Sequence, residues 1–409
     1  MKINFFVVFL SLLNLYCSAN RSQPDLGSFE ISQKKEIKVG AEQLEMYWPL
    51  IKNKKVAFVV NQTSRMGAAH VIDSLHSLGL DIARIFAPEH GFRGTADAGE
   101  KIKDGKDVAT GVPITSLYGK KRKPAAADLS GVDWVIFDIQ DVGARFYTYI
   151  SSMHYVMQAC AEQGIPFMVL DRPNPNGHYV DGPVLDTTFR SFVGMHEVPV
   201  IHGMTVGEYA TMVNKEGWLG QDLQCDLTVI PCGGYTHQTA YELPIKPSPN
   251  LPNNRAIYLY PSLCFFEGTQ ASVGRGTDKQ FQLIGLPDYP GGEYSFTPVP
   301  KPGARYPKHQ DKLCKGYDLS ISSPADIRKE SRLNLSYLLE VYQNAPDQAS
   351  FFLKSNFFDK LAGGGSLRDQ VKAGWTEQQI RESWEPKLGQ FKQKRKKYLL
   401  YPDQFEIKN

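Results

Sequence analysis

Acidic and basic side chains gather where an apolar stretch of this sequence ends. In "IFAPEHGFRG" Pro88 breaks the apolar run, and Glu89, His90 and Arg93 follow between glycines. An acid beside apolar residues and a glycine turn is partly desolvated, which raises the pKa of a carboxyl group toward the range of a general acid. The stretch therefore predicts proton-transfer chemistry at Glu89, with His90 as a second catalytic candidate. Capping of the Gly91 turn, or pairing with Arg93, is the structural alternative for Glu89.

Further carboxylates stand next to aromatic residues. Asp138 and Asp141 are followed by Arg145 and Tyr147, and Glu267 comes directly after two phenylalanines. Paired carboxylates with aromatic neighbours suit sugar chemistry, in which one group protonates the leaving oxygen and another assists at the anomeric centre. An ordinary ion pair or turn cap is the alternative for the two aspartates, because structural networks also use Asp–Arg pairs.

Other chemistries lack their sequence signals. The turn "NQTSRMG" after the first apolar run contains neither the GxGxxG fingerprint nor a phosphate-loop lysine, which argues against a nucleotide cofactor. The histidines are scattered without an HExxH pattern, and there is no GxSxG elbow around a serine nucleophile. We therefore expect an enzyme without cofactor or metal.

Strands must position these residues. Continuous apolar runs such as "KKVAFVV" and "DWVIFD" alternate with helical patterns such as "HYVMQACAEQG". This alternation predicts an α/β fold, with a Rossmann-like N-terminal domain built on a parallel sheet that has helices on both faces. Ligands of open α/β sheets bind beyond the carboxyl ends of the strands. We therefore expect four polar strand ends to converge on one crevice, namely Asn61–Gln62, Glu89–His90, Asp138 to Asp141, and Asp171–Arg172.

Prolines 244, 247, 249 and 252 mark a domain boundary. The predicted domains are residues 36–250, the Rossmann-like catalytic domain, and residues 251–409, a smaller α+β auxiliary domain that completes the cleft. Helices are expected near residues 333–345, 347–361 and 376–397.

Residues 1–19 read as a signal peptide. Lys2 precedes the apolar core Phe5 to Leu15, and Cys17-Ser18-Ala19 suits cleavage, so the mature chain should begin near Asn20. Lipid attachment at Cys17 is disfavoured because Tyr16 is bulky. The prediction is an exported protein, periplasmic or secreted. No later stretch reaches membrane length, and a net charge of +3 without a large basic cluster argues against nucleic acid.

Several stretches together resemble the exo-β-N-acetylmuramidases of the NamZ type. They run in order from about residue 56 to residue 401 and include "FAPEHGFRG", "FDIQDVGARFYTYI", "LDRPNPNG", "PVIHGMTVGEYA" and "FFEGTQASVGRGTDKQFQLIG". The resemblance implies a Rossmann-like catalytic domain plus an auxiliary domain, with the site in the cleft between them. It also implies a glycosidase that releases N-acetylmuramic acid from the non-reducing ends of peptidoglycan fragments, so that muropeptides or MurNAc-GlcNAc saccharides are the expected partners.

The resemblance also assigns residues. Its PEHG acid falls on Glu89, the expected general acid/base, and its FEGT carboxylate falls on Glu267. "SVGRGTD" adds Arg275 and Asp278 to the expected cleft. Muramic acid carries a lactyl carboxylate, for which an arginine fork is a suitable partner. The sequence does not show which arginine binds this carboxylate. The expected substrate-binding residues are Arg93, Asp138, Asp141, Arg145, Tyr147, Asp171, Arg172, Arg275 and Asp278.

Two other function classes compete with the glycosidase. A periplasmic saccharide-binding protein without catalysis would also enclose a sugar between two lobes, but on aromatic surfaces without a buried general acid. A deacetylase or esterase acting on the same polymer normally needs a metal cluster or an activated serine, and the sequence signals neither. The glycosidase is therefore the favoured prediction.

Overall fold

A seven-stranded sheet organises the first half of the protein, whose computed structural model describes residues 36–89, 91–93, 104–220 and 222–403. The strand order is β5-β6-β4-β1-β7-β8-β9. All neighbours pair parallel except β5, which pairs antiparallel with β6 at the edge. The strands are β1 (Lys55–Val60), β4 (Asp81–Ala87), β5 (Gly105–Lys106), β6 (Pro113–Ser116), β7 (Trp134–Asp138), β8 (Phe167–Leu170) and β9 (Leu227–Ile230).

The parallel strands follow the doubly wound order 3-2-1-4-5-6 when they are numbered along the chain. Such sheets have a crevice where the strand order reverses, here between β1 and β7. In this protein the two loops at that point bind each other. The Ser64 hydroxyl donates to the Asp138 carbonyl, and the Gln140 N–H donates to the Thr63 hydroxyl at 3.0 Å. Side chains thus occupy the usual ligand position.

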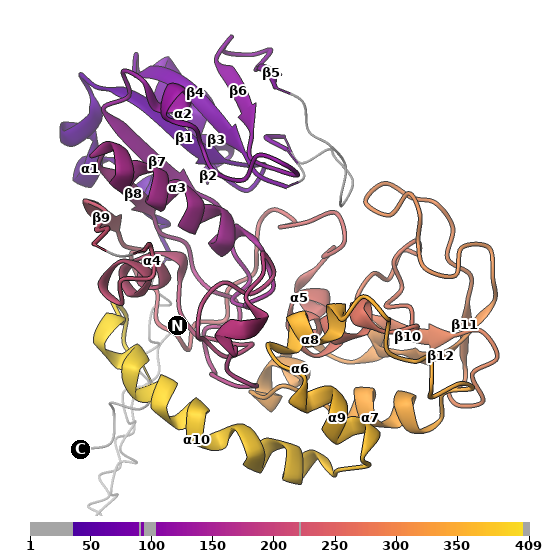
Figure 1. Ribbon diagram of the computed structural model, residues 1–409. Helices are drawn as coiled ribbons and strands as arrows, with labels where there is room; N and C mark the ends of the chain where they lie inside the picture. The colour runs from indigo at the N-terminus through magenta and orange to yellow at the C-terminus, as the bar shows by residue number, and fades with distance from the viewer. Residues whose placement is uncertain (1–35, 90, 94–103, 221, 404–409) are drawn as a thin grey trace, which may run out of the picture. The chain divides into compact units, whose positions relative to one another are not determined.

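Helices cover both faces of the sheet, as the alternation of patterns predicted (Figure 1). Alternate residues of β1 enter different cores. Val56, Phe58 and Val60 pack with helices α1 and α2, whereas Ala57 and Val59 pack with α3 and α4. A strand that is buried on both faces needs the continuous apolar run seen in the sequence. The helices are α1 (Leu44–Ile51), α2 (Val71–Ser77), α3 (Tyr149–Gln163) and α4 (Val206–Lys215), and a two-stranded hairpin of β2 (Arg65–Met66) and β3 (Ala69–His70) precedes α2.

The second half is α+β, as predicted. Its antiparallel sheet has the order β10-β12-β11 and lies among short helices. The strands are β10 (Leu283–Leu286), β11 (Tyr294–Phe296) and β12 (Cys314–Asp318). The helices are α5 (Asn254–Leu263), α6 (Pro324–Glu330), α7 (Ser336–Gln343), α8 (Phe357–Ala362), α9 (Ser366–Lys372) and α10 (Glu377–Arg395).

The helix predicted over residues 347–361 is wrong in its first ten residues. Only Phe357–Ala362 is helical. The Asp347 carboxylate instead accepts the N–H groups of Ala349 and Ser350, which makes a turn. Asn356 then has φ of +56°, which a continuous right-handed helix does not allow.

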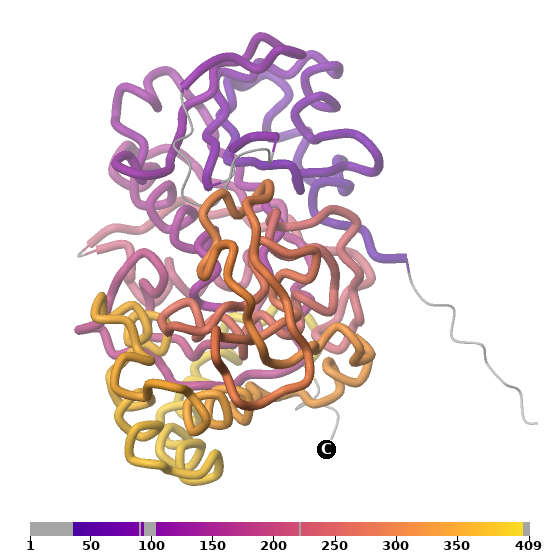
Figure 2. The backbone as a smooth tube through the Cα atoms, turned by 90° about the vertical axis from the view of Figure 1, so that its right-hand side faces the viewer, coloured from indigo at the N-terminus to yellow at the C-terminus, as the bar shows by residue number. Residues whose placement is uncertain are grey.

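Helix α10 runs along the second half and ends beside α4 of the first (Figure 1), and it belongs to the yellow coils at the lower left of Figure 2. Its last residue, Arg395, donates to the Gly203 carbonyl at 2.6 Å, and beyond the helix the Tyr401 hydroxyl donates to Asp171 at 2.5 Å. The chain from Glu36 onward accordingly forms one compact unit. The division at residue 250 stays a prediction. Among the described residues, no helix is long and apolar enough to cross a membrane.

Candidate active site

A cavity of about 440 Å³ lies beyond the carboxyl ends of β4 and β6. Its volume falls within the range of small-molecule sites. Residues from both halves line it, so neither half forms the site alone. They are Glu89, Tyr118, Gly119, Arg122, Phe146, Tyr147, Thr148, Tyr149, Phe192, Val193, Ser248, Asn250, Leu251, Tyr260, Cys264, Glu267, Arg275, Phe281, Phe357 and Leu361.

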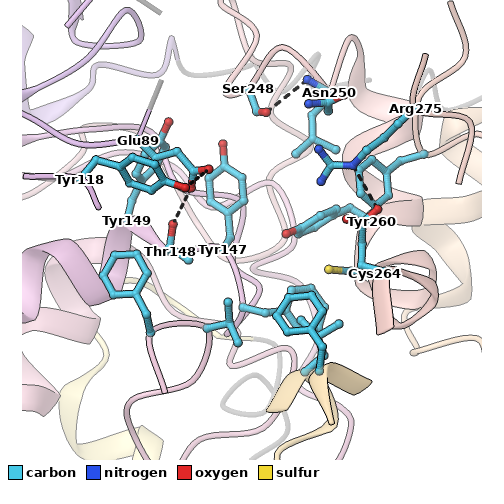
Figure 3. Close-up of a pocket in the computed structure, with 18 of the residues that line it drawn as sticks. Glu89, Tyr118, Tyr147, Thr148, Tyr149, Ser248, Asn250, Tyr260, Cys264 and Arg275 are labelled. Carbon is cyan, nitrogen blue, oxygen red and sulfur yellow. Dashed lines mark hydrogen bonds and ion pairs between the residues drawn. The ribbon is translucent and has the colours of Figure 1, made fainter. Parts of the chain in front are cut away.

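Glu89 stands at the end of β4, where Pro88 stops the strand, and its side chain is half-buried. Hydroxyl groups bind both carboxyl oxygens. The Tyr118 hydroxyl donates to Oε1 at 3.0 Å and the Thr148 hydroxyl donates to Oε2 at 3.4 Å, as the dashed lines in Figure 3 show. Tyr118 follows β6 and Thr148 precedes α3. Two separate elements therefore fix the orientation of this carboxyl group.

Glu267 comes from the second half, on the short 3-10 helix η4 (Cys264–Gly268), and pairs with Arg275. The Arg275 Nε lies 3.0 Å from Glu267 Oε1, and the guanidinium lies over the Phe281 ring. Burial alone would lower the pKa of Arg275, but the neighbouring Glu267 carboxylate raises it above its ordinary value. The charge of Glu267 thus already has a cationic partner, whereas no lysine or arginine of the described residues forms an ion pair with Glu89.

Aromatic rings form a continuous wall in the cavity. Tyr147 packs edge-to-face on Tyr149 and on Tyr260, with ring centroids 5.0 and 5.8 Å apart, and Tyr260 packs on Phe281 at 5.0 Å. The hydroxyls of Tyr147 and Tyr149 both donate to the carbonyl of Pro247, at 2.8 and 3.3 Å. The wall is therefore held rigidly, and it offers apolar surface of the kind on which sugar rings pack.

Comparison with known proteins identifies the family. Residues 56–255 match the N-terminal and residues 258–401 the C-terminal family profile described as exo-β-N-acetylmuramidase NamZ. The chain belongs to the NamZ family of exo-β-N-acetylmuramidases. It is 37% identical to the peptidoglycan β-N-acetylmuramidase NamZ of Bacillus subtilis (strain 168), across 94% of this chain and 96% of that protein.

Two crystal structures of DUF1343 family proteins from Bacteroides fragilis share the fold. One is 48% identical with a TM-score of 0.84, and the other is 28% identical with a TM-score of 0.74. Each match covers 90% of this chain and 99% of the other chain. The resemblance seen in the sequence is thus confirmed, and the chain is a glycosidase of the NamZ family with the predicted α/β fold.

Four of the residues predicted for the NamZ-type site line the cavity, namely Glu89, Tyr147, Glu267 and Arg275. Their roles stay predictions. His90 lies outside the described residues.

Asp138 and Arg172 form a buried ion pair away from the cavity lining. The Arg172 Nε and a second guanidinium nitrogen contact the two Asp138 oxygens at 2.5 and 2.9 Å, and the two side chains are 0% and 3% exposed. Asp171 is also buried and accepts from Thr205, Gly207 and Tyr401. Burial raises the pKa of Asp171 to about 6. These groups tie the ends of β7 and β8 to the rest of the fold, so the four polar strand ends do not meet in one open crevice.

Asp141 and Arg145 are buried without forming an ion pair with each other. Burial raises the pKa of Asp141 to about 7, and its Oδ1 accepts the Gly143 N–H at 2.6 Å. Arg145 donates to three backbone carbonyls, and burial lowers the pKa of its guanidinium to about 9. Those carbonyls belong to Pro183, Val198 and Leu361. Arg145 thus joins the first half to α8.

The remaining two predicted residues bind other side chains. Arg93 contacts Asp73 at 3.2 Å and Asp107 at 3.0 Å. Asp278 pairs with Lys301, and its side chain is 90% exposed. Neither Arg93 nor Asp278 lines the cavity. Across the described parts of the chain, no group of three or more His, Cys, Asp or Glu residues could hold a metal ion.

Sequence reasoning missed Tyr118, Arg122 and Thr148. Tyr118 and Arg122 follow β6, a strand of four residues that begins with a proline and gives almost no periodic signal. Recognising that short strand would have placed both residues at the same sheet edge as Glu89. Thr148 lies between two tyrosines that the sequence motif already contained.

Proposed function

We propose that this chain hydrolyses the β-glycosidic bond of a terminal N-acetylmuramic acid residue and releases that sugar from the non-reducing ends of peptidoglycan fragments. The observation that carries the proposal is the pair of carboxyl groups in one aromatic-walled cavity, Glu89 between two hydroxyls and Glu267 beside a guanidinium. The B. subtilis relative, described as a peptidoglycan β-N-acetylmuramidase, supports the substrate.

Different environments suggest different roles for the two carboxyl groups. Glycoside hydrolysis needs one group to protonate the leaving oxygen and a second to assist at the anomeric centre. Among the described residues, no lysine or arginine forms an ion pair with Glu89, whereas Arg275 pairs with Glu267. A group that must exchange a proton works best without a fixed cation, because a cation favours the ionised form. We assign the general acid/base role to Glu89 and charge stabilisation at the anomeric centre to Glu267.

His90 and the cell location complete the proposal. We keep His90, the residue after Glu89, as a further catalytic candidate. The first nineteen residues are proposed to direct export and to be removed, which would place the enzyme in the periplasm or outside the cell, where peptidoglycan fragments occur. The N-terminal sequence of the exported protein tests this. A start near Asn20 supports cleavage, a diacylglyceryl group on Cys17 shows a lipoprotein, and an unprocessed Met1 in the cytoplasm contradicts export.

Glu89→Gln tests the assignment because it keeps the shape of the side chain and removes the transferable proton. With a chromogenic β-N-acetylmuramide we expect kcat to fall about 10²- to 10⁴-fold, the usual contribution of general acid–base help. Glu197→Gln, at an exposed carboxyl that does not line the cavity, is the matched control. Sugar binding and the melting temperature of Glu89→Gln should stay near those of the wild type.

Two outcomes would contradict the proposal. Near-normal kcat in Glu89→Gln, together with earlier melting, would reduce Glu89 to a turn-capping residue. A wild-type protein that binds the sugar but cleaves neither the muramide nor its β-N-acetylglucosaminide analogue would instead be the saccharide-binding protein.

A further inference from the structure

The sugar released by the proposed reaction carries a negative charge that must enter an already acidic cavity. N-Acetylmuramic acid differs from N-acetylglucosamine by a lactyl ether that ends in a carboxylate. Glu89 and Glu267 both line the cavity, so a third carboxylate needs a cation beside it. Among the described residues, the cationic side chains in the lining are Arg122 and Arg275. This inference rests on the proposed function.

The arginines named from the sequence are already engaged. Arg275 pairs with Glu267, Arg172 with Asp138, and Arg93 with Asp73 and Asp107. Arg145 is fully buried, and three carbonyls accept its N–H groups. A carboxylate that approached Arg172, Arg93 or Arg145 would have to displace an existing partner, and one that approached Arg275 would have to share its guanidinium with Glu267.

Arg122 has a different environment. It is exposed, and it lies in the loop between β6 and the 3-10 helix η2 (Ala126–Leu129). Among the described residues, no carboxylate forms an ion pair with it. The lysines on either side of it are both paired, Lys121 with Asp128 at 2.8 Å and Lys123 with Glu162 at 2.6 Å.

An aromatic ring positions the Arg122 guanidinium. The guanidinium carbon lies 4.3 Å from the centroid of the Phe192 ring. Phe192 in turn stacks on Tyr155 at 16° and 6.3 Å, and its carbonyl accepts the Ser151 hydroxyl at 2.7 Å. A guanidinium that is stacked on a ring keeps its N–H groups in the plane, where they can bind a carboxylate through two hydrogen bonds.

We propose that Arg122 is the specificity-determining residue that binds the lactyl carboxylate of the terminal muramic acid. Arg122 belongs to the loop after β6 that also carries Tyr118, whose hydroxyl binds Glu89. Binding the acidic substituent here selects the muramide over the glucosaminide and leaves both catalytic carboxyl groups available.

The test compares two chromogenic substrates that differ only in this charge, 4-nitrophenyl β-N-acetylmuramide and the same glycoside with its lactyl carboxylate converted to a carboxamide. For Arg122→Gln we expect kcat/KM for the acid to fall about 10- to 100-fold, the usual loss for a hydrogen bond to a charged group. For the carboxamide we expect a change of less than about threefold. For Arg122→Lys, kcat/KM for the acid should lie between the values of the wild type and Arg122→Gln, because lysine keeps the charge but lacks the planar fork of the guanidinium.

Lys123→Gln is the matched control, since it removes a positive charge from the adjacent residue that pairs with Glu162 outside the cavity. Lys123→Gln should leave kcat/KM for both substrates unchanged. The assignment of Arg122 would be overturned if Arg122→Gln lowered kcat/KM equally for both substrates. It would also be overturned if the variant kept the preference of the wild type for the acid.

Calorimetric titration separates this proposal from the proposed function. Free N-acetylmuramic acid should bind the wild type more tightly than N-acetylglucosamine does, and Arg122→Gln should remove that difference. If the difference disappears as expected but the wild type cleaves no glycoside, the hydrolytic function fails while Arg122 remains the carboxylate-binding residue. If the wild type binds both sugars equally, the Arg122 proposal fails.

Discussion

The carboxyl group of Glu89 accepts hydrogen bonds on both oxygens, and the shorter one comes from Tyr118 at 3.0 Å. Tyr118→Phe removes this hydrogen bond and keeps the ring. We expect kcat to fall about 10-fold or more, because hydrogen bonds to charged groups are among the stronger ones.

Thr148→Val is the matched variant for Tyr118→Phe. The Thr148 hydroxyl lies 3.4 Å from Glu89 Oε2, and this longer hydrogen bond predicts a smaller decrease in kcat. A Tyr118→Phe enzyme with a near-normal kcat would show that the hydroxyl does not position Glu89.

Asp138 shows that residue type alone does not distinguish a substrate-binding carboxylate from a structural one. The sequence placed it with the substrate-binding residues, whereas the structure pairs it with Arg172 at 0% exposure. Removing one partner of a buried ion pair leaves an uncompensated charge and typically costs about 3–5 kcal/mol of stability. Asp138→Asn should therefore melt much earlier or fail to fold, while any folded fraction keeps a near-normal KM.

Thermal unfolding and Michaelis kinetics on one preparation test Asp138→Asn. Asp278→Asn, at an exposed carboxyl, should leave the melting temperature unchanged. A strong rise in KM at normal stability would return Asp138 to the substrate-binding residues.

Strand signals explain which elements could be predicted. The apolar runs of β1, β4 and β7 are long enough to be recognised, and Glu89 was predicted because it directly follows one of them. Strand β6 has only four residues and could not be recognised in the sequence, so the position of the following loop, with Tyr118 and Arg122, could not be predicted. Glu267 and Arg275 lie eight residues apart, and their contact depends on the fold of the loop between them.

Lys308 binds the backbone of that loop, which consists of η4 and the residues that follow it. Its ammonium donates to the carbonyls of Phe266, Thr269 and Ala271 at 2.5 to 3.0 Å. Burial lowers its pKa to about 8. Lys308→Met leaves the three carbonyls without this donor, so Glu267 loses its fixed position. We expect kcat to fall about 10-fold with a smaller change in KM, because catalysis depends on placement of the carboxyl group.

The pH–rate profile supplies a second readout for Lys308. The wild type should lose activity as pH rises through about 8, because a neutral amine has one N–H fewer for three acceptors. Lys308→Met should lack that descending limb. Lys312→Met, at an exposed neighbour, is the control and should behave as the wild type. A Lys308→Met profile identical to the wild type would contradict the positioning role.

On the scale of the whole molecule, polar residues that read as site candidates connect the halves. Arg145 donates to the Leu361 carbonyl of α8, and Asp171 accepts the hydroxyl of Tyr401 beyond α10. The partners lie 216 and 230 residues away in the sequence. No local pattern carries information about such distant contacts, so a buried arginine and a catalytic arginine look alike in the sequence.

Burial of Asp141 makes the stability of the whole protein depend on pH. Its pKa is about 7 in the folded protein and has the ordinary value of 3.8 when unfolded. Between these pH values the folded state binds more protons than the unfolded state. The stabilisation from Asp141 is therefore fully present below about pH 4 and is lost as the pH rises to about 7. Asp141→Asn cannot ionise, so it should escape this loss.

The free energies of unfolding of wild type and Asp141→Asn, measured in urea at pH 4, 5, 6 and 7, test this. Subtracting the two proteins isolates Asp141, because Asp171, whose pKa is raised to about 6, contributes equally to both. The variant should gain stability relative to the wild type at each step up to about pH 7, and above that the difference should stay constant. A difference that is independent of pH would mean that Asp141 is already ionised in the folded protein. The backbone N–H groups of Val142 and Gly143 would then stabilise the buried charge enough to offset its desolvation.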